Sequence, residues 1–383
     1  MKAARIVLML LMTLGPVLPG MGLNLDVRVF SGERIRSFRF TVVKGYYHMD
    51  AGQAHKTWSR FQQVELKAEG NKVAVYRNDS RILTAATVVF EGAHDENIFR
   101  LQVPGRWERD YDDGLKVRAS GGDLILINQV DLEHYVGGVV QSEMGKVDFP
   151  EYYKIQDIIS RTYALKNIRK HQHEGFNLCD AEHCQVYLSR CTLPLISESI
   201  SVTRGDVIVD SAGNLITAAF HSNSGGQTMA SEDVWSAPLP YLRSVEDTFS
   251  LKMSKAVWQD TILLSSWLAY LHKRRPLLGD DTLIQRVIRF EQPQRRTELV
   301  PGILLKDIRR DWQLRSTFFD IIPRGDTLML RGRGWGHGVG LSQQGALRMI
   351  SLGYDYIQVI RFYYQGVRVV PRDADTNQIL RDR

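Results

Sequence analysis

Cysteine is scarce in this sequence, and the few residues present are confined to one short stretch. Only Cys179, Cys184 and Cys191 occur among 383 residues. A fold held together by several disulfides needs cysteines distributed along the chain, so this class of protein is excluded. The thiols instead indicate a local site. Cys191 lies beyond the other two and is interpreted as a packing residue or an unpaired thiol.

Long apolar runs are missing beyond the N-terminus, which excludes later membrane-spanning helices. The chain opens with Lys2 and Arg5, followed by an apolar run over residues 6–18. This order is typical of a secretory signal, so residues 1–22 are predicted to be a signal peptide or membrane anchor. We expect export to the periplasm or cell envelope, with membrane contact only through an uncleaved N-terminal segment.

A strong charge of either sign is also lacking, since the net charge is only +6. An exported basic protein meets an anionic cell-envelope polymer more readily than a nucleic acid, because export separates it from the genome. A nucleic-acid partner is therefore not expected. The alternative is that the charge simply keeps the protein soluble.

Standard nucleotide-binding motifs are absent, although one segment is rich in glycine. Residues 332–346 place glycine at every second position from 332 to 340, around Trp335 and His337. The segment lacks the Lys-Ser/Thr of a P-loop and the helix-opening pattern of a dinucleotide-binding fold. Alternating glycine is unfavourable in a regular strand, so we expect another group to approach this backbone closely. That group is either a ligand or a second strand of the same protein.

The spacing of apolar residues divides the chain into two parts. Over the first 128 or so residues, short segments alternate apolar and polar side chains and are separated by turn signals such as Pro104-Gly105. From Asp131 the spacing becomes helical, with helices expected over residues 131–140 and 150–171. The predicted fold class is α+β, with a β-rich N-terminal part followed by a mixed α/β domain.

Two cysteines and three histidines fall within residues 171–184. Thiolates and imidazoles are the usual ligands of tetrahedral Zn²⁺, and His173, Cys179, His183 and Cys184 can supply four of them. Four protein ligands close the coordination sphere, so this zinc is expected to be structural. A disulfide between Cys179 and Cys184 and a pair of buried free thiols are the alternatives.

Glu143 is expected in the junction between the two predicted helices. A glutamate in a partly apolar cleft has a raised pKa and can donate a proton near neutral pH, as cleavage of a glycosidic bond requires. From spacing alone, a surface or capping carboxylate is the simpler interpretation.

Several motifs occur in a fixed order along the second part of the chain. They lie at residues 131–144, 161–165, 220–226, 232–235, 239–242, 314–317, 332–346 and 362–366. Together they resemble the stage II sporulation protein D / amidase enhancer (SpoIID/LytB) family over about residues 123–366. The expected division is a signal peptide or anchor (1–22), a β-rich region (23–122), a SpoIID/LytB-like peptidoglycan-processing domain (123–366) and a C-terminal tail (367–383).

The resemblance implies a peptidoglycan lytic transglycosylase. Such family members cleave the MurNAc-GlcNAc bond of denuded glycan strands, from which stem peptides have been removed, and leave 1,6-anhydro-MurNAc ends. The family's essential acid falls on Glu143, and a family zinc site falls on His173, Cys179, His183 and Cys184. Because the C6 hydroxyl of the substrate is the nucleophile, one carboxylate acts first as acid and then as base. A second carboxylate is not required, unlike in ordinary glycoside hydrolases.

Motif position also identifies candidate residues of a substrate groove. They are Tyr163, His221, Ser224, Trp235, Trp335, His337 and Gln343. Aromatic faces suit sugar rings, and polar side chains suit hydroxyl and N-acetyl groups, although core packing or loop bracing is an alternative for each. The chain departs from the family pattern at Gln344, where an aromatic is common, and in the charged segment 268–312.

Two other classes of function stay open at this point. The family's second name implies a non-catalytic glycan-binding protein that enhances an N-acetylmuramoyl-L-alanine amidase, so a cell-wall amidase is a candidate partner beside glycan strands. A zinc-dependent hydrolase is disfavoured, because the expected ligands fill the coordination sphere of the metal.

Overall fold

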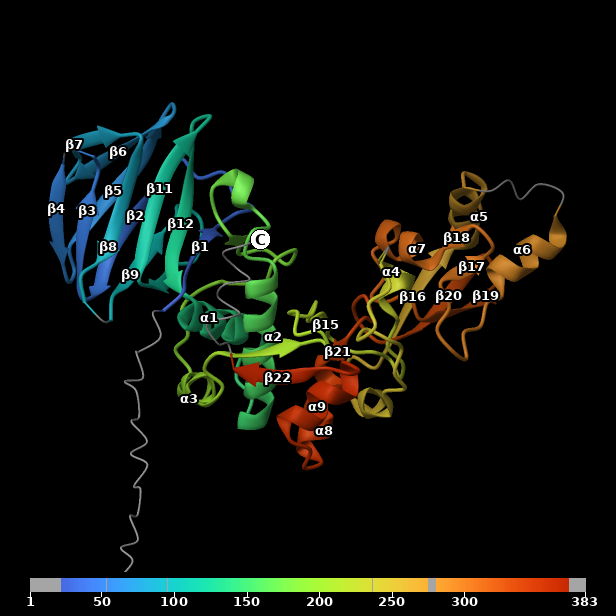
Figure 1. Cartoon of the computed structure of the whole chain (residues 1–383). Helices are drawn as coiled ribbons and strands as arrows, with labels where there is room; N and C mark the ends of the chain where they lie inside the picture. The colour runs from blue at the N-terminus through green and yellow to red at the C-terminus, as the bar shows by residue number, and fades with distance from the viewer. Residues whose placement is uncertain (1–21, 53, 95, 236, 275–279, 372–383) are drawn as a thin grey trace, which may run out of the picture.

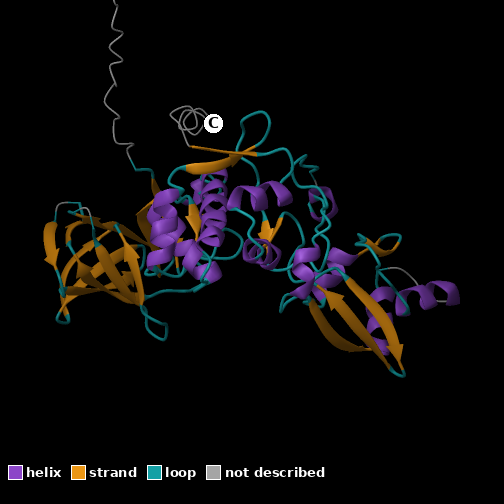
Figure 2. Ribbon diagram, turned by 90° about the horizontal axis from the view of Figure 1, so that it is seen from below, coloured by secondary structure: helices purple, strands orange, loops and turns teal. Residues whose placement is uncertain are grey.

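The computed structural model describes residues 22–371 with the exception of 53, 95, 236 and 275–279. The expected signal segment therefore lies, apart from its last residue, outside the described residues. Figure 1 shows three parts in a row: a two-sheet sandwich, a central part dominated by helices, and an outer part, and Figure 2 shows the same order from below. The predicted α+β class with a β-rich N-terminal part is confirmed. Within the described ranges, none of the helices combines the length and hydropathy needed to span a bilayer.

Two sheets packed face to face form the sandwich. Their strands are β1 (Asn24–Val29), β2 (Ser37–Lys44), β3 (Tyr46–Asp50), β4 (His55–Ser59), β5 (Gln63–Glu69), β6 (Lys72–Arg77), β7 (Ser80–Ala85), β8 (Thr87–Gly92), β9 (Ile98–Gln102), β10 (Arg109–Asp112), β11 (Gly114–Ser120), β12 (Asp123–Asp131) and β13 (Leu178–Cys179). The sheet orders are β13-β1-β12-β11-β8-β3-β4 and β10-β9-β2-β5-β6-β7. Phe38, Phe40 and Val42 alternate inwards along β2, and Phe40 stacks on Phe90 of the opposite sheet with ring centroids 4.0 Å apart.

The central part places helices beside the sandwich. Its elements are α1 (Leu132–Met144), α2 (Pro150–Lys166), η1 (Gln172–Glu174), α3 (Pro194–Val202), β14 (Asp206–Val209), β15 (Phe220–His221), α4 (Ser231–Val234), η2 (Thr248–Lys252), β21 (Leu341–Ser342), α8 (Gln343–Ser351), α9 (Tyr356–Tyr363) and β22 (Arg368–Pro371). Asp131 caps α1 by accepting a hydrogen bond from the backbone N–H of Glu133. Tyr135 and Val139 of α1 belong to the same apolar core as the sandwich, so the helix is fixed on it. β22 lies within the predicted tail and pairs with β14.

A buried ion pair joins α1 to α2. Arg161 of α2 is fully buried, and its Nε lies 2.9 Å from Oε1 of Glu133 in α1. A further guanidinium nitrogen donates to the carbonyl oxygen of Asp206 at 2.9 Å. Breaking such a pair leaves an unpaired buried charge and costs about 3–5 kcal/mol. The pair therefore holds α1 in one orientation on α2.

The outer part has its own core and contains most of the charged segment that the family motifs did not cover. Its elements are β16 (Val257–Leu263), α5 (Leu264–His272), α6 (Asp281–Ile288), β17 (Glu298–Val300), β18 (Ile303–Leu304), α7 (Leu305–Asp311), β19 (Phe319–Arg324) and β20 (Thr327–Arg333). The main sheet has the order β16-β20-β19. Trp267 and Leu271 of α5 and Leu330 of β20 are buried in its core, so this segment is a folded unit.

Candidate active site and metal centre

Glu143 lies in the last turn of α1, and not in a junction after it, because the helix continues to Met144. Its Oε1 accepts a hydrogen bond from the backbone N–H of Val186 at 3.1 Å. One carboxyl oxygen is thereby anchored by a segment that is 43 residues away in the sequence.

The surroundings of Glu143 favour its protonated form. Burial raises the pKa of Glu143 above its ordinary value of 4.5, the hydrogen bond from Val186 lowers it, and the charge of Glu182 raises it. The net direction is upward. The negative end of the helix dipole acts in the same sense, because the residue sits at the C-terminus of α1. A carboxyl group that keeps its proton closer to neutral pH meets the requirement for a general acid.

Residues 186–193 lie along the C-terminal half of α1 and are called the strap below. Three consecutive side chains of α1 accept hydrogen bonds from its backbone. These bonds join Val186 to Glu143 at 3.1 Å, Leu188 to Ser142 at 3.0 Å and Thr192 to Gln141 at 2.7 Å. The position of the Glu143 carboxyl group therefore depends on the strap.

Gly138 permits the close approach of the strap to α1. A methyl group at this position would lie 2.3 Å from Cε2 of Tyr187 and 2.5 Å from the carbonyl oxygen of Ser189. We expect Gly138→Ala to lower the free energy of unfolding by about 1–3 kcal/mol, because the strap must move. Denaturant unfolding measures the loss. Gly137→Ala is the matched control with a smaller expected loss, since its new methyl group meets its nearest atoms at 3.0 Å. An unchanged stability of Gly138→Ala would contradict the tight contact.

His171, Cys179, His183 and Cys184 form a compact group just before the strap. One ligand atom from each lies within 4.8 Å of all the others. The two Nε2 atoms of the histidines are 3.3 Å apart, and the histidine-to-sulfur distances are 3.3 Å for the His183–Cys179 pair and 3.4 Å for the His171–Cys184 pair. A tetrahedral Zn²⁺ with its usual bond lengths separates its ligand atoms by about 3.3–3.8 Å, so the group fits this ion. All of these cysteines are free thiols in the structure.

The structure brings His171 into this group in place of His173. The side chain of His173 is 79% exposed, and its Nε2 lies 3.7 Å from the carboxylate of Glu174. His171 instead turns its Nε2 towards the cysteines, while its Nδ1 lies 2.5 Å from Oε1 of Glu174. A carboxylate on the second ring nitrogen is typical of metal-binding histidines. His171 immediately precedes the short turn η1 and His173 lies within it, so their side chains point in different directions, which spacing in the sequence does not reveal.

The electrostatics of the group favour a bound cation. The hydrogen bond from Cys184 lowers the pKa of Cys179 to about 5, whereas the same contact raises the pKa of Cys184. A thiolate is the form in which cysteine binds a metal. Tyr163, predicted as a groove residue, lies at this group, where its hydroxyl donates to the carbonyl oxygen of His183 at 3.1 Å.

The glycine-rich run crosses residues 219–225, so the group that approaches it closely is a second segment of the same protein. A Cβ atom at Gly340 would lie 2.1 Å from the carbonyl oxygen of Ala219, and one at Gly334 would lie 2.7 Å from that of Asn223. Both glycines have positive φ angles, 72° and 76°, which other residues rarely adopt. β15 and β21 pair in parallel at this crossing.

The crossing gathers four of the predicted groove residues. The ring of His337 lies 5.6 Å from that of His221 and 5.5 Å from that of Trp235. Trp235 is 36% exposed and Trp335 is 39% exposed, so both indole rings are open to a ligand. His221 is buried, and its Nδ1 lies 3.1 Å from the carbonyl oxygen of Val339.

The other two predicted groove residues, Ser224 and Gln343, do not lie among these aromatic rings. Ser224 is fully buried, and its hydroxyl lies 2.7 Å from both Asp247 and Ser250, so the structure places it inside the protein instead of in a groove. Gln343 begins α8, and its Nε2 lies 3.4 Å from Sδ of Met144, the neighbour of Glu143. The glycine-rich run thus extends from the exposed tryptophans to the helix end that carries the carboxyl group.

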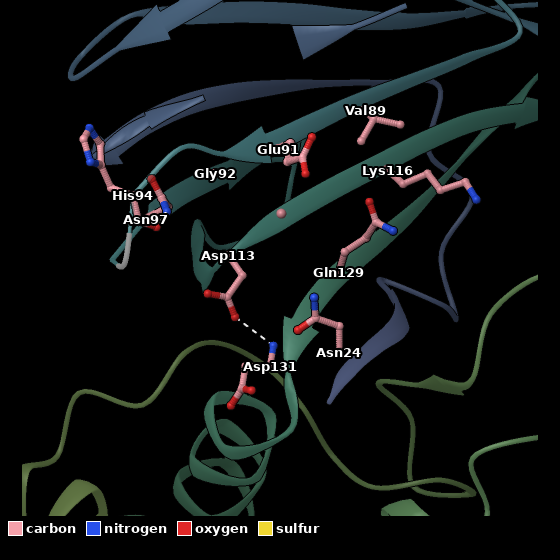
Figure 3. A pocket seen from close by; sticks show the side chains of 11 residues that line it. Asn24, Val89, Glu91, Gly92, His94, Asn97, Asp113, Lys116, Gln129 and Asp131 are labelled. Atoms are coloured by element: carbon pink, nitrogen blue, oxygen red, sulfur yellow. Dashed lines mark hydrogen bonds between the residues drawn. The ribbon is translucent and has the colours of Figure 1, made fainter. Parts of the chain in front are cut away.

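A cavity of about 550 Å³ lies away from this region, on the larger sheet near the start of α1 (Figure 3). Its lining is mixed and includes the polar side chains of Glu91, Lys116 and Gln129. Asp113 accepts a hydrogen bond from the backbone N–H of Asp131 at 2.8 Å, as the dashed line in Figure 3 shows. The described residues that line this cavity include none of the site residues predicted from the sequence.

Two arginines of the outer part were missed by the sequence reasoning. Arg295 donates to the carbonyl oxygens of Ser224 and Gln227, both at 2.6 Å, and so braces the crossing. Arg309 lines a small cavity beside His337. For Arg295, the signal in the sequence was its position in the adjacent pair Arg295-Arg296. This pair lies in the segment that no family motif covers.

Comparison with known proteins assigns the chain to a family. The family model for stage II sporulation protein matches residues 120–209, which contain Glu143, the Cys/His group and the strap. Stage II sporulation protein D of Bacillus amyloliquefaciens is 31% identical over 266 residues, covering 65% of this chain and 76% of that protein. The chain therefore belongs to the SpoIID/LytB family.

Two further relatives agree with this assignment. Stage II sporulation protein D of Bacillus subtilis (strain 168) is 30% identical over 274 residues, covering 66% of this chain and 78% of that protein. The amidase enhancer of the same organism is 26% identical over 283 residues, covering 60% of this chain and 39% of that protein. The family thus includes relatives named for two different roles.

Proposed function

We propose that the protein is an exported peptidoglycan lytic transglycosylase. It cleaves the MurNAc-GlcNAc bond of denuded glycan strands and leaves 1,6-anhydro-MurNAc ends. The observation that carries the proposal is Glu143, a partly buried carboxyl group with a raised pKa, anchored by Val186 at the end of α1. Family membership supports the substrate class, and the exposed tryptophans supply surfaces on which sugar rings can lie.

In the first step Glu143 acts as the general acid. Its carboxyl proton passes to the glycosidic oxygen as the bond from that oxygen to C1 of MurNAc breaks, so GlcNAc leaves as an alcohol. Positive charge develops on the MurNAc ring, as in other glycoside cleavages. The Val186 N–H then stabilises the carboxylate that this transfer produces.

In the second step the same carboxylate acts as the base. It removes the proton of the C6 hydroxyl of the same MurNAc, and the C6 oxygen bonds to C1 to close the 1,6-anhydro ring. Glu143 regains its proton, and no water is consumed. A single carboxyl group therefore completes the cycle.

We further propose that His171, Cys179, His183 and Cys184 hold a structural Zn²⁺. Bound zinc would supply a cross-link between the end of α2 and the start of the strap, since Val186 follows Cys184 by two positions. The thiolate character of Cys179 and the fit of the ligand distances support this role. The ion acts on Glu143 only through the position of the strap.

The competing proposal is that the chain binds glycan and stimulates a cell-wall amidase without cleaving glycan itself. It rests on the relative named amidase enhancer. Purified denuded strands incubated with the protein, followed by mass spectrometry, separate the two. Anhydro-muramyl products from the protein alone support the transglycosylase. An absence of such products, together with faster release of stem peptides from intact, peptide-bearing peptidoglycan by an added N-acetylmuramoyl-L-alanine amidase, would establish the enhancer instead.

The pH dependence of the reaction should follow the protonation of Glu143. The acid form is lost as pH rises through its pKa, so kcat/KM should fall on the alkaline side at a pH above the ordinary value of 4.5. Glu182 raises this pKa, so Glu182→Gln should move the falling limb to lower pH. Initial rates across the pH range test this. A limb that moves to higher pH in Glu182→Gln would contradict the assignment of the limb to Glu143.

A further inference from the structure

A small cavity beside His337 has an excess of positive charge and is called the cationic pocket below. It has a volume of about 30 Å³, and its charged lining residues include Arg296, Lys306 and Arg309. Asp233 is the single carboxylate among the described residues that line it. Three cations therefore face one anion, which favours an anionic ligand.

Among the described residues, Arg309 places an unsatisfied guanidinium nitrogen at the pocket. Arg309 comes from α7, and its Nε is buried without a hydrogen-bond partner in the described part of the chain. Arg310, the next residue, instead forms ion pairs with Asp307 and Asp311 at 2.9 Å. A buried cationic group without a partner is unfavourable, so a bound anion would relieve this cost.

His337, which lines the pocket, and the adjacent His221 supply ring nitrogens for hydrogen bonds but no charge. Burial, followed by the charge of Arg309 and then that of Arg295, lowers the pKa of His337 to about 4, and the pKa of the adjacent His221 is also lowered by burial. Both rings are neutral at physiological pH. His221 also has a buried Nε2 without a hydrogen-bond partner among the described residues. The surface of the pocket is mainly apolar, and Nε of Arg309 and Nε2 of His221 are unsatisfied polar atoms at or near it among the described residues.

One exposed indole ring adjoins the pocket, and a second belongs to Trp335, two positions before His337 in the chain. Trp235 packs against His337, which lines the pocket, and leaves part of its surface open to solvent. Trp335 lies beneath two further cations, Lys255 at 5.4 Å and Arg315 at 5.1 Å from the ring centroid. Aromatic faces bordered by cations suit a sugar that carries a negative charge.

We propose that the cationic pocket binds the lactyl carboxylate of a MurNAc residue in a peptide-free glycan strand, while the sugar ring lies on the adjoining indole surface. This inference rests on the proposed function and identifies the part of the substrate that the outer part of the protein recognises. The cavity volume of about 30 Å³ is only two to three times the roughly 10–15 Å³ that a single water needs, so the pocket takes a small anionic group.

The pocket also explains a preference for denuded strands. Removal of the stem peptide exposes the lactyl carboxylate, which can bond to Arg309 and Lys306. In a peptide-bearing strand the same carbon is part of an amide, which has no charge and continues into a chain too large for the pocket. The protein therefore distinguishes denuded from peptide-bearing strands at the lactyl carboxyl group. The cations attract the free carboxylate, and the small pocket excludes the peptide chain.

The pocket lies within reach of the proposed acid along one backbone segment. Gln343 follows His337 by six positions, so their Cα atoms are at most about 22 Å apart. Gln343 contacts Met144, the neighbour of Glu143. A single extended strand can therefore occupy the pocket with one MurNAc and place another bond at Glu143.

Binding in the non-cleaving Glu143→Gln background tests the proposal. Fluorescently labelled denuded strands are compared with the same strands after carbodiimide conversion of their carboxylates to primary amides, which alters charge with little change in size. We expect the carboxylate strands to bind at least about tenfold more tightly, the value of one charge-assisted hydrogen bond. Replacing Arg309 and Lys306 by glutamine in this background should bring the two affinities to within about twofold.

Arg310→Gln in the same background is the matched control, and it should retain the full preference. Equal affinities for both strands before any pocket substitution would overturn the inference while leaving the cleavage proposal intact. A preference that survives the double substitution in a folded protein would overturn it as well. Failure to bind either strand, with no cleavage by the unmodified protein, would overturn the proposed function itself.

Discussion

Glu143→Gln is expected to lower the formation of anhydro-muramyl products from denuded strands by about 100- to 10,000-fold or more. General acid–base catalysis contributes rate factors of this size, and here one group serves in both steps. The amide cannot supply the proton or take up that of the C6 hydroxyl. Its carbonyl oxygen can still accept the Val186 N–H bond, so the fold and the strap should be preserved. Product analysis by mass spectrometry and a thermal unfolding curve together measure the two effects.

Glu182→Gln is the control for this substitution at a nearby carboxylate. Glu182 is exposed and contributes only its charge to the surroundings of Glu143, so this variant should keep activity within a few-fold at the optimal pH. Substantial product formation by a folded Glu143→Gln protein would remove Glu143 from the mechanism.

The double substitution Cys179→Ser/Cys184→Ser is expected to abolish zinc binding and to lower the free energy of unfolding by more than about 4 kcal/mol. Two of the four ligand atoms are lost, and the hydroxyl groups that replace them are poor zinc ligands. The unmodified protein should carry about one zinc per chain. Elemental analysis and denaturant unfolding provide the measurements. Activity should fall as well, because the strap that positions Glu143 begins two residues after Cys184.

Cys191→Ser controls for the loss of a thiol outside the group. Cys191 lies beyond the four clustered residues, so this variant should bind zinc normally. Unmodified protein without zinc, with Cys179 and Cys184 joined in a disulfide by mass spectrometry, would show that the alternative cross-link is correct and that the metal proposal is wrong.

The parts of this protein that could be predicted from the sequence are those encoded by local patterns. Alternation of apolar residues gave the β-rich N-terminal part, and the change to helical spacing after Asp131 gave α1 and α2. The Cys/His stretch indicated a compact group, of which Cys179, His183 and Cys184 lie together in the structure. The glycine-rich run required a close neighbour, and the structure identifies that neighbour as residues 219–225.

The parts that could not be predicted depend on direction and on distant contacts. His171 and His173 are two positions apart, and only the turn η1 decides which one faces the cysteines. Ser224 belongs to a polar motif that suits a groove, yet its hydroxyl is used by Asp247 inside the protein. The role proposed for Arg309 could not be predicted from neighbouring residues in the sequence. It depends on a buried Nε atom that the described residues folded around it leave without a hydrogen-bond partner.

The contact of Gln343 with Met144 joins residues that are 199 positions apart. Glu143 is therefore made early in synthesis, whereas the segment that lies beside it is made near the end of the chain. Contacts of such long range form late, because the loop between them must close first. A chain that ends before α8 would carry the proposed acid without the contact of Gln343 with Met144 beside it. Synthesis of the chain through α8 is thus a built-in condition for completing the surroundings of Glu143.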